Sequence, residues 1–182
     1  MSQSVLLVID MLKDYFEEGE LKKHKNSLVE EINDLVKRAR ERSVNIVWVR
    51  QEFEPDLRDA FLVMKDKGIK KTIKGTLGSQ VLDELDKQSQ DIEVVKKRYS
   101  AFFQTKLDEI LKQMEASELI ITGINTHACI RMAAIDAYQR DYRVIIPREC
   151  VYSRDKVHHD ISLQYLSRGI SQVVFSKDIN FT

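Results

Sequence analysis

This sequence lacks several features that would assign it to large classes of protein. Its 182 residues include only two cysteines, too few for the disulfide framework of many small secreted domains. No apolar run approaches the roughly 20 residues that span a bilayer. The 29 basic and 29 acidic residues balance, so no broad attraction to nucleic acid or to an anionic membrane is expected. The expected partner is therefore a small molecule.

Signals of secretion and of a second domain are also missing. Residues 1–4 lead directly into an apolar segment, without the basic region or cleavable stretch of a leader. No internal repeat, low-complexity tract or linker divides the chain, and its length suits one core. We therefore expect a single cytoplasmic domain that spans residues 1–182.

The sequence does contain a regular alternation of short apolar segments and longer amphipathic ones. The strand-like segments are 5–9, 44–49, 92–95, 119–124, 143–146 and 172–175. Helical spacing occurs at 28–39, 78–85, 106–114, 128–139 and 157–166, and Ser27 with Glu30 fits a capping box. The alternation predicts an α/β fold, a three-layer αβα sandwich around a Rossmann-like, mostly parallel sheet of six strands.

An irregular stretch, residues 51–76, interrupts this alternation. We expect it to pass over the edge of the sheet, where it could act as a lid. It carries six large apolar side chains among its charges: Phe53, Leu57, Phe61, Leu62, Val63 and Met64. Because these side chains need cover from the domain or from a neighbouring copy, the sequence favours a homo-oligomer, most simply a two-fold dimer.

Three strand-like segments end in, or lead directly into, a reactive side chain. Asp10 follows the first, Lys96 follows the third, and the fourth leads through residues 125–128 to Cys129. The carboxyl ends of parallel strands share one edge of an open sheet, where ligands bind. A carboxylate, an ammonium and a thiol at that edge could act as base, cation and nucleophile, which indicates a cysteine hydrolase.

Each of these residues also has a structural interpretation. Cys129 alone would more often be a core residue, since free cysteine is among the most buried types. Its place in the first turn of a helix, near a cation, instead favours a thiol with a lowered pKa. Asp10 could hold a loop, but a desolvated carboxylate beside a thiol can accept its proton. Lys96 follows apolar residues, so we expect it, rather than Lys97 or Arg98, to stabilise the charges.

The remaining candidates carry less information. Zinc sites take three or four clustered ligands, and we expect no other histidine beside His127, so no metal site is predicted. Asp14 is interpreted as a loop residue. Cys150 is interpreted as a small buried residue, with a resolving thiol as the alternative.

The segments around the reactive residues resemble the isochorismatase-like cysteine hydrolases. That family includes nicotinamidases, N-carbamoylsarcosine amidohydrolases, and ureidoacrylate or biuret hydrolases. Together with the order of strands and helices, the resemblance covers nearly the whole chain. The matching segments follow one another as residues 6–16, 96–105, 121–129 and 133–138.

The resemblance implies a catalytic triad of Asp10, Lys96 and Cys129, with no cofactor. It also implies a non-proline cis peptide between Ile124 and Asn125. In the family this bend aims the backbone N–H groups of the residues matching Asn125 and Cys129 at a developing oxyanion. Gln51 matches a glutamine that lines the site in several members. We expect further substrate contacts from the 51–76 stretch and from three aromatic residues, Tyr15, Phe16 and Tyr99.

Departures from the family pattern narrow the range of expected substrates. Nicotinamidases carry an Asp-x-His metal motif and a further histidine after the second strand, whereas residues 50–56 contain no histidine. This puts nicotinamide and its metal in doubt. Members that act on isochorismate can lack the cysteine, so Cys129 favours hydrolysis of a small amide or ureide through a thioester. Two alternatives stay open: a vinyl-ether hydrolase in which Asp10 protonates the substrate, and a non-catalytic binding protein or thiol sensor.

Overall fold

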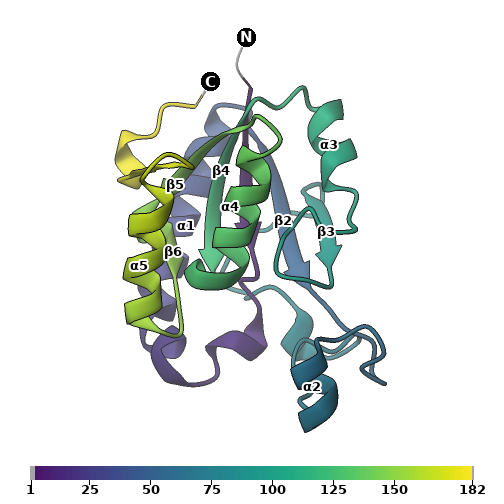
Figure 1. The fold of residues 1–182 in the computed structure, drawn as a ribbon. Coiled ribbons are helices and arrows are strands. Elements are labelled where there is room, and N and C mark those ends of the chain that lie inside the picture. Colours follow the sequence, from purple (N-terminus) through teal and green to yellow (C-terminus); the bar gives the residue numbers. More distant parts are fainter. Residues whose placement is uncertain (1–2, 182) are drawn as a thin grey trace.

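A single parallel sheet forms the centre of the computed structural model, which describes residues 3–181 (Figure 1). Its order is β3-β2-β1-β4-β5-β7, with β6 beside β4, and the pairings between these strands are all parallel. The strands are β1 (Ser4–Ile9), β2 (Asn45–Gln51), β3 (Ile92–Lys96), β4 (Glu118–Ile124), β5 (Arg143–Pro147), β6 (Val151–Tyr152) and β7 (Gln172–Val174).

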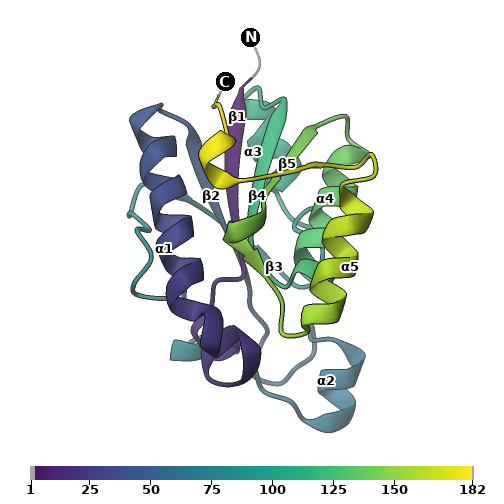
Figure 2. The ribbon, with the colours of Figure 1, turned by 90° about the vertical axis from the view of Figure 1, so that its left-hand side faces the viewer.

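Helices cover both faces of this sheet (Figure 2). They are α1 (Gly19–Glu41), α2 (Leu62–Lys67), α3 (Leu107–Gln113), α4 (Arg131–Tyr138) and α5 (Lys156–Leu166). Successive side chains of a strand point to opposite faces, so Leu7 packs with α3, α4 and α5 while Leu6 packs with α1. Within residues 3–181, no helix is both long and apolar enough to cross a membrane. The predicted three-layer α/β sandwich is confirmed.

Most elements agree with the sequence prediction, and each exception has a physical cause. The two-residue strand β6 was not predicted, and it is too short to show an alternating pattern. The helix predicted over 78–85 is wrong, because the backbone of Gln80 and Leu82 bonds instead to the segment that follows β1. The capping box is also wrong. Helix α1 begins at Gly19, so Ser27 lies inside it and bonds to the carbonyl of His24.

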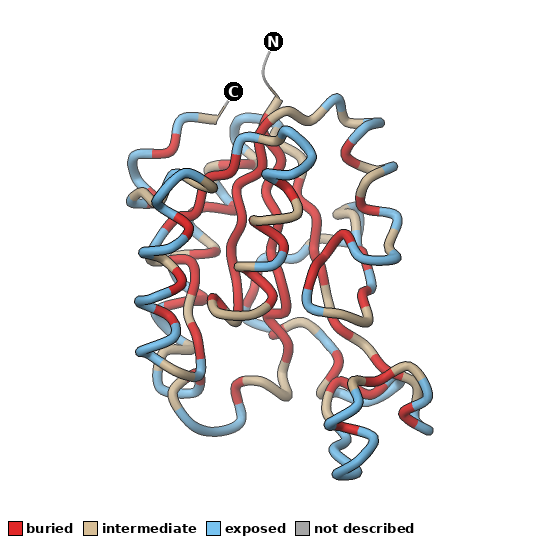
Figure 3. The backbone as a smooth tube through the Cα atoms, in the orientation of Figure 1, coloured by how far each residue is buried: buried red, intermediate tan, exposed pale blue. Residues whose placement is uncertain are grey.

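The 51–76 stretch forms a small apolar cluster of its own beside the carboxyl end of the sheet, and Figure 3 shows its buried positions among exposed ones. Leu62 and Val63 of α2 stay 75% and 49% exposed. Much of the apolar surface that suggested an oligomer is thus covered by the chain itself, and assembly stays a prediction. The members of the cluster are Phe53, Leu57, Ala60, Met64 and Ile73, with Phe61 packed against them.

The direction of the strand order reverses between β1 and β4, the place where open α/β sheets bind ligands. The chain proceeds from β1 to β2 and β3 in one direction, and from β4 to β5 and β7 in the other. At such a reversal the loops after two adjacent strands diverge, which leaves an opening at their carboxyl ends. The arrowheads in Figure 1 point to this edge, on the side of α2. Asp10 follows β1 and Asn125 follows β4, so both lie at the reversal.

Candidate active site

The structure brings together the three reactive residues that the sequence singled out. The Nζ atom of Lys96 lies 2.7 Å from Oδ2 of Asp10 and 3.4 Å from Sγ of Cys129. Its remaining N–H donates to the carbonyl of Arg98 at 3.0 Å. Lys96 is 0% exposed, Asp10 is 1% exposed and Cys129 is 5% exposed. A cation, a carboxylate and a thiol are therefore buried together at the carboxyl edge of the sheet.

Burial and charge act in opposite directions on Lys96. Burial lowers the pKa of its ammonium, but the neighbouring Asp10 and Cys129 raise it, and the net pKa is raised. Lys96 is therefore a cation at neutral pH. Because Asp10 and Lys96 are both buried, each depends on the other for charge compensation.

The pKa of the Cys129 thiol differs from the sequence prediction. Burial, the largest cause, raises this pKa to about 12, although Lys96 opposes the effect. The prediction of a lowered pKa is wrong because it considered the helix start and the cation but not the loss of solvent. The positive charge of Lys96 is also shared with Asp10. The resting thiol thus keeps its proton at neutral pH and needs a base to remove it.

This raised pKa predicts the pH dependence of thiol alkylation. In a Cys150→Ala background, iodoacetamide should react with Cys129 more slowly at pH 7 than with an exposed thiol of pKa ~8.5. The thiolate fraction increases as pH rises toward a pKa of about 12, so the rate should still be increasing above pH 9. The measurement is the alkylation rate from pH 6 to 10. A rate that stays constant down to pH 6 would instead show a thiolate in the resting protein.

The backbone that carries Cys129 has an unusual local geometry. The peptide bond between Ile124 and Asn125 is cis, which is the geometry expected from the family resemblance. A π-helical turn over Thr126–Ile130 follows it and contains Cys129, and α4 begins only at Arg131. The predicted helix over 128–139 is thus divided in two. Such π turns occur frequently at functional sites.

Strands β1 and β4 approach each other closely just before the reactive residues. Gly123 has a φ of +108°, and a Cβ atom there would lie 2.0 Å from the carbonyl oxygen of Ile9. Asp10 follows Ile9 with a φ of 56°, and its N–H donates to Val49 at 2.8 Å. Only a residue without a side chain at position 123 therefore allows the two strand ends to lie this close together.

We expect Gly123→Ala to lower the free energy of unfolding by roughly 3 kcal/mol or more, because the methyl group meets backbone. Gly169→Ala is the matched control. Its φ is +139°, but no atom lies within 4 Å of the added Cβ. Urea denaturation of both variants separates the clash from backbone strain. Equal losses in the two variants would contradict the close-approach account.

Polar residues from two other segments surround the triad. The hydroxyl of Tyr15 donates to Oε1 of Gln51 at 2.5 Å, and Gln51 lies beside Lys96 in the register of β2 and β3. Burial raises the pKa of Tyr15 well above its usual value, and the nearby Asp10 and Cys129 raise it further. Tyr15 and Gln51 thus lie beside the triad, and their contact with a substrate stays a prediction.

The other two aromatic candidates lie in different surroundings. Phe16 is 4% exposed and packs in the core beneath α1, so the structure assigns it a packing role instead. Tyr99 is 48% exposed and stacks on Phe61 of the 51–76 stretch at 4.6 Å. Tyr99 therefore connects the segment that follows β3 to the 51–76 stretch.

Sequence reasoning missed Thr72, which the structure places beside Tyr15. Thr72 is 0% exposed and has a φ of 54°. Its N–H donates to Oδ2 of Asp14 at 2.5 Å, so Asp14 connects the segment after β1 to the 51–76 stretch. An irregular, charged stretch gives no local signal for such a residue, since its position depends on contacts with a distant segment.

His127 has a histidine neighbour, contrary to the sequence interpretation. Its ring lies 5.8 Å from that of His158, and it forms a hydrogen bond with Ser153. Burial lowers the pKa of His127, and the charges of Arg154 and His158 lower it further. Among residues 3–181, no group of three or more histidine, cysteine, aspartate or glutamate side chains is arranged to hold a metal ion.

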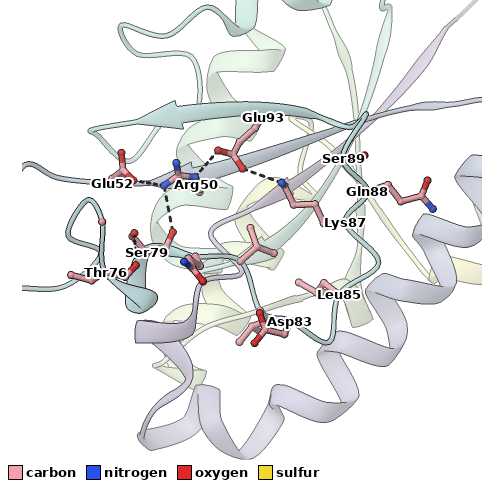
Figure 4. Close-up of a pocket in the computed structure, with 14 residues that line it drawn as sticks. Arg50, Glu52, Thr76, Ser79, Asp83, Leu85, Lys87, Gln88, Ser89 and Glu93 are labelled. Atoms are coloured by element: carbon pink, nitrogen blue, oxygen red, sulfur yellow. Dashed lines mark hydrogen bonds and ion pairs between the residues drawn. The ribbon is translucent and has the colours of Figure 1, made fainter.

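An open cavity of about 610 Å³ lies elsewhere, between the β2–β3 edge and residues 75–89 (Figure 4). Four of its charged groups pair with one another, and the fifth, Asp83, pairs with Lys13 outside the lining at 2.8 Å. Arg50 contacts Glu52 at 2.6 Å and Glu93 at 2.7 Å, and Lys87 contacts Glu93 at 3.2 Å. No triad residue lines this cavity, so it is separate from the candidate site.

A doubly wound parallel sheet with reactive residues at its topological reversal defines this chain as a doubly wound α/β protein. The sequence comparison identifies the family. The isochorismatase domain, as a family model, matches residues 4–178, and the chain belongs to the isochorismatase family of hydrolases.

Three relatives illustrate the range of this family. A protein of Arabidopsis thaliana, described as a probable inactive nicotinamidase, is 36% identical over 146 residues, which are 76% of this chain and 74% of the relative. The maleamate amidohydrolase of Pseudomonas putida is 27% identical, over 95% of this chain and 83% of the relative. The crystal structure of N-carbamoylsarcosine amidase from Thermoplasma acidophilum superposes with a TM-score of 0.82 at 28% identity, and the alignment covers 98% and 99% of the two chains.

Proposed function

We propose that this chain is a metal-independent cysteine hydrolase that cleaves the C–N bond of a small amide or ureide. The observation that carries the proposal is the contact of one buried cation, Lys96, with both Asp10 and Cys129. Two of the relatives are named as an amidohydrolase and an amidase, and both names denote cleavage of this kind of bond.

In the proposed mechanism, the raised pKa of Cys129 makes Asp10 necessary as the base. Asp10 accepts the thiol proton as sulfur attacks the substrate carbonyl, and it then protonates the departing amine or ammonia. Lys96 stabilises the thiolate that forms during attack. Water, activated by Asp10, then hydrolyses the thioester. Backbone N–H groups of Asn125 and Cys129 are proposed to stabilise the oxyanion.

A non-catalytic binding protein on this fold is the second candidate. The observation that favours it is the Arabidopsis relative described as probably inactive. That description concerns nicotinamidase activity, and residues 50–56 here lack the histidines of nicotinamidases. Loss of activity on nicotinamide is therefore compatible with activity on a different amide.

A screen of small amides and ureides for ammonia release tests the proposed function. We expect turnover of at least one compound, little turnover of nicotinamide, and unchanged activity after exhaustive treatment with a chelator. The Cys129→Ala protein serves as the blank. An inactive wild-type protein across a broad panel would favour the binding protein, and activity that chelation removes would contradict metal independence.

A further inference from the structure

The π-helical turn that carries Cys129 lies against one neighbouring segment, residues 151–159. This segment comprises β6, a short loop and the start of α5. Strand β6 pairs with the last two residues of β4, Gly123 and Ile124, directly before the turn. Both β6 and α5 then contact the turn itself. The position of the turn therefore depends on this segment as well as on β4.

Three consecutive residues at the start of the turn each form a side-chain hydrogen bond with the 151–159 segment. Their partners are a backbone N–H group, an imidazole and a hydroxyl group. The pairs are Asn125 with the N–H of Arg154 at 3.0 Å, Thr126 with Nδ1 of His159 at 2.8 Å, and His127 with Ser153. These bonds hold the chain just before Cys129.

The bond between Thr126 and His159 is the most deeply buried of those with two side-chain partners that include α5. Thr126 is 0% exposed and His159 is 8% exposed. Burial lowers the pKa of His159, so its ring is neutral at neutral pH. A neutral imidazole and a hydroxyl group can each donate or accept, so the bond forms with either tautomer of the ring. Loss of one partner would leave the other buried and unpaired.

The polarity of α5 is the reverse of that of an ordinary surface helix. His159 and Ser162 are 8% and 1% exposed, whereas Val157 and Ile161 are 66% and 51% exposed. Of the buried residues of α5, only Leu166 is apolar. A helix that only covers a sheet buries its apolar side chains, as α1 does. The buried imidazole is therefore explained by its bond to the turn rather than by packing alone.

We infer that His159 is a positioning residue of the candidate active site, and that its bond to Thr126 holds the turn in the geometry that presents Cys129. The inference deepens the proposed function and rests on it for the identity of the reaction. His159 acts through Thr126 and not by contact with the substrate. Loss of the bond should let the turn move and let water reach Cys129, so attack on the substrate becomes slower.

Substitutions at position 159 test whether the bond to Thr126 matters. The side-chain amide of asparagine places a polar atom near the position of Nδ1, whereas that of glutamine places it near Nε2. His159→Leu and His159→Gln should lower kcat for the amide found in the screen by roughly ten- to a hundredfold, the cost of a misplaced reacting group. KM should stay within about twofold, because substrate binding is unchanged. His159→Asn should restore most of kcat.

A double-mutant cycle tests whether the two side chains act through one bond. Thr126→Val removes the hydroxyl group, and Thr126→Ser keeps it and should retain kcat. If the bond is the cause, the double variant Thr126→Val/His159→Leu should be within about twofold of the slower single variant. Losses of kcat that multiply in the double variant, or no rescue by either His159→Asn or Thr126→Ser, would overturn the proposal.

Alkylation of the two cysteines by iodoacetamide gives a readout that needs no turnover. In His159→Leu, or in Thr126→Val if that variant does not fold, water should reach Cys129 and lower its pKa. A fall of about one unit makes Cys129 react about tenfold faster at pH 8. Cys150 reports opening of the whole fold, and its rate should not change.

Mass spectrometry of the two cysteine peptides measures both rates in one sample. Equal acceleration at both cysteines would show general loosening and overturn the proposal, as would an unchanged rate at Cys129. Acceleration at Cys129 alone, in a protein that hydrolyses no amide, would support the positioning role of His159 and remove the proposed reaction.

Discussion

Replacement of Cys129 by alanine is expected to abolish hydrolysis of any amide that the wild-type chain turns over. The loss in kcat should be on the order of 10⁴-fold or more, because no other nucleophile replaces the thiol. The buried side chain becomes smaller by a single sulfur atom, so the fold should persist. Ammonia release under substrate saturation, with circular dichroism on the same samples, measures both effects.

Cys150→Ala is the matched control for this prediction. Cys150 is also a buried free thiol, but it packs beneath α1 and contacts the carbonyl of Glu31 at 3.5 Å. Its removal should leave kcat unchanged. Full activity of Cys129→Ala would contradict the thioester mechanism and favour the vinyl-ether type of reaction, in which Asp10 protonates the substrate.

Loss of either member of the buried ion pair is expected to have the largest effect on stability. Lys96→Met leaves the carboxylate of Asp10, 1% exposed, without its cation, and it should lower the free energy of unfolding by about 3–5 kcal/mol. Asp10→Asn leaves Lys96 unpaired and should destabilise similarly, while kcat falls by roughly 10²–10⁴ as the base is lost. Urea denaturation and ammonia release measure the two effects.

The double variant Asp10→Asn/Lys96→Met should recover part of the stability, because neither buried charge is then left alone. Lys97→Met is the surface control. Lys97 pairs with Asp59 at 2.9 Å with both side chains partly exposed, so its loss should cost less than about 1 kcal/mol. A Lys96→Met loss no greater than that of Lys97→Met would contradict the account of the buried pair.

The sequence predicts the sheet and the meeting of the reactive residues for one physical reason. Apolar runs mark strands that are covered on both faces, and parallel strands carry the residues at their carboxyl ends to a common edge. Asp10 and Cys129 come after β1 and β4, which are buried along their whole length, and Lys96 ends the edge strand β3, in which buried and exposed residues alternate. All three strands are parallel, so the proximity of these residues can be inferred without coordinates. Their catalytic roles stay proposals.

Other features depend on contacts that no local pattern contains. The segment 78–85 pairs with the chain after β1, which overrides its helical spacing. The thiol pKa of Cys129 depends on how completely the fold excludes water from it. The backbone of Thr72 is held by Asp14, which is far away in sequence.

The central claim is that the reaction proceeds through a thioester on Cys129. Its most direct test is mass spectrometry of wild-type protein quenched in acid during turnover of the best amide from the screen. The account predicts that the peptide containing Cys129 gains the mass of the acyl group and loses it once substrate is consumed. Turnover with this peptide unmodified at every quench time, and with the acyl group on another residue, would contradict the claim.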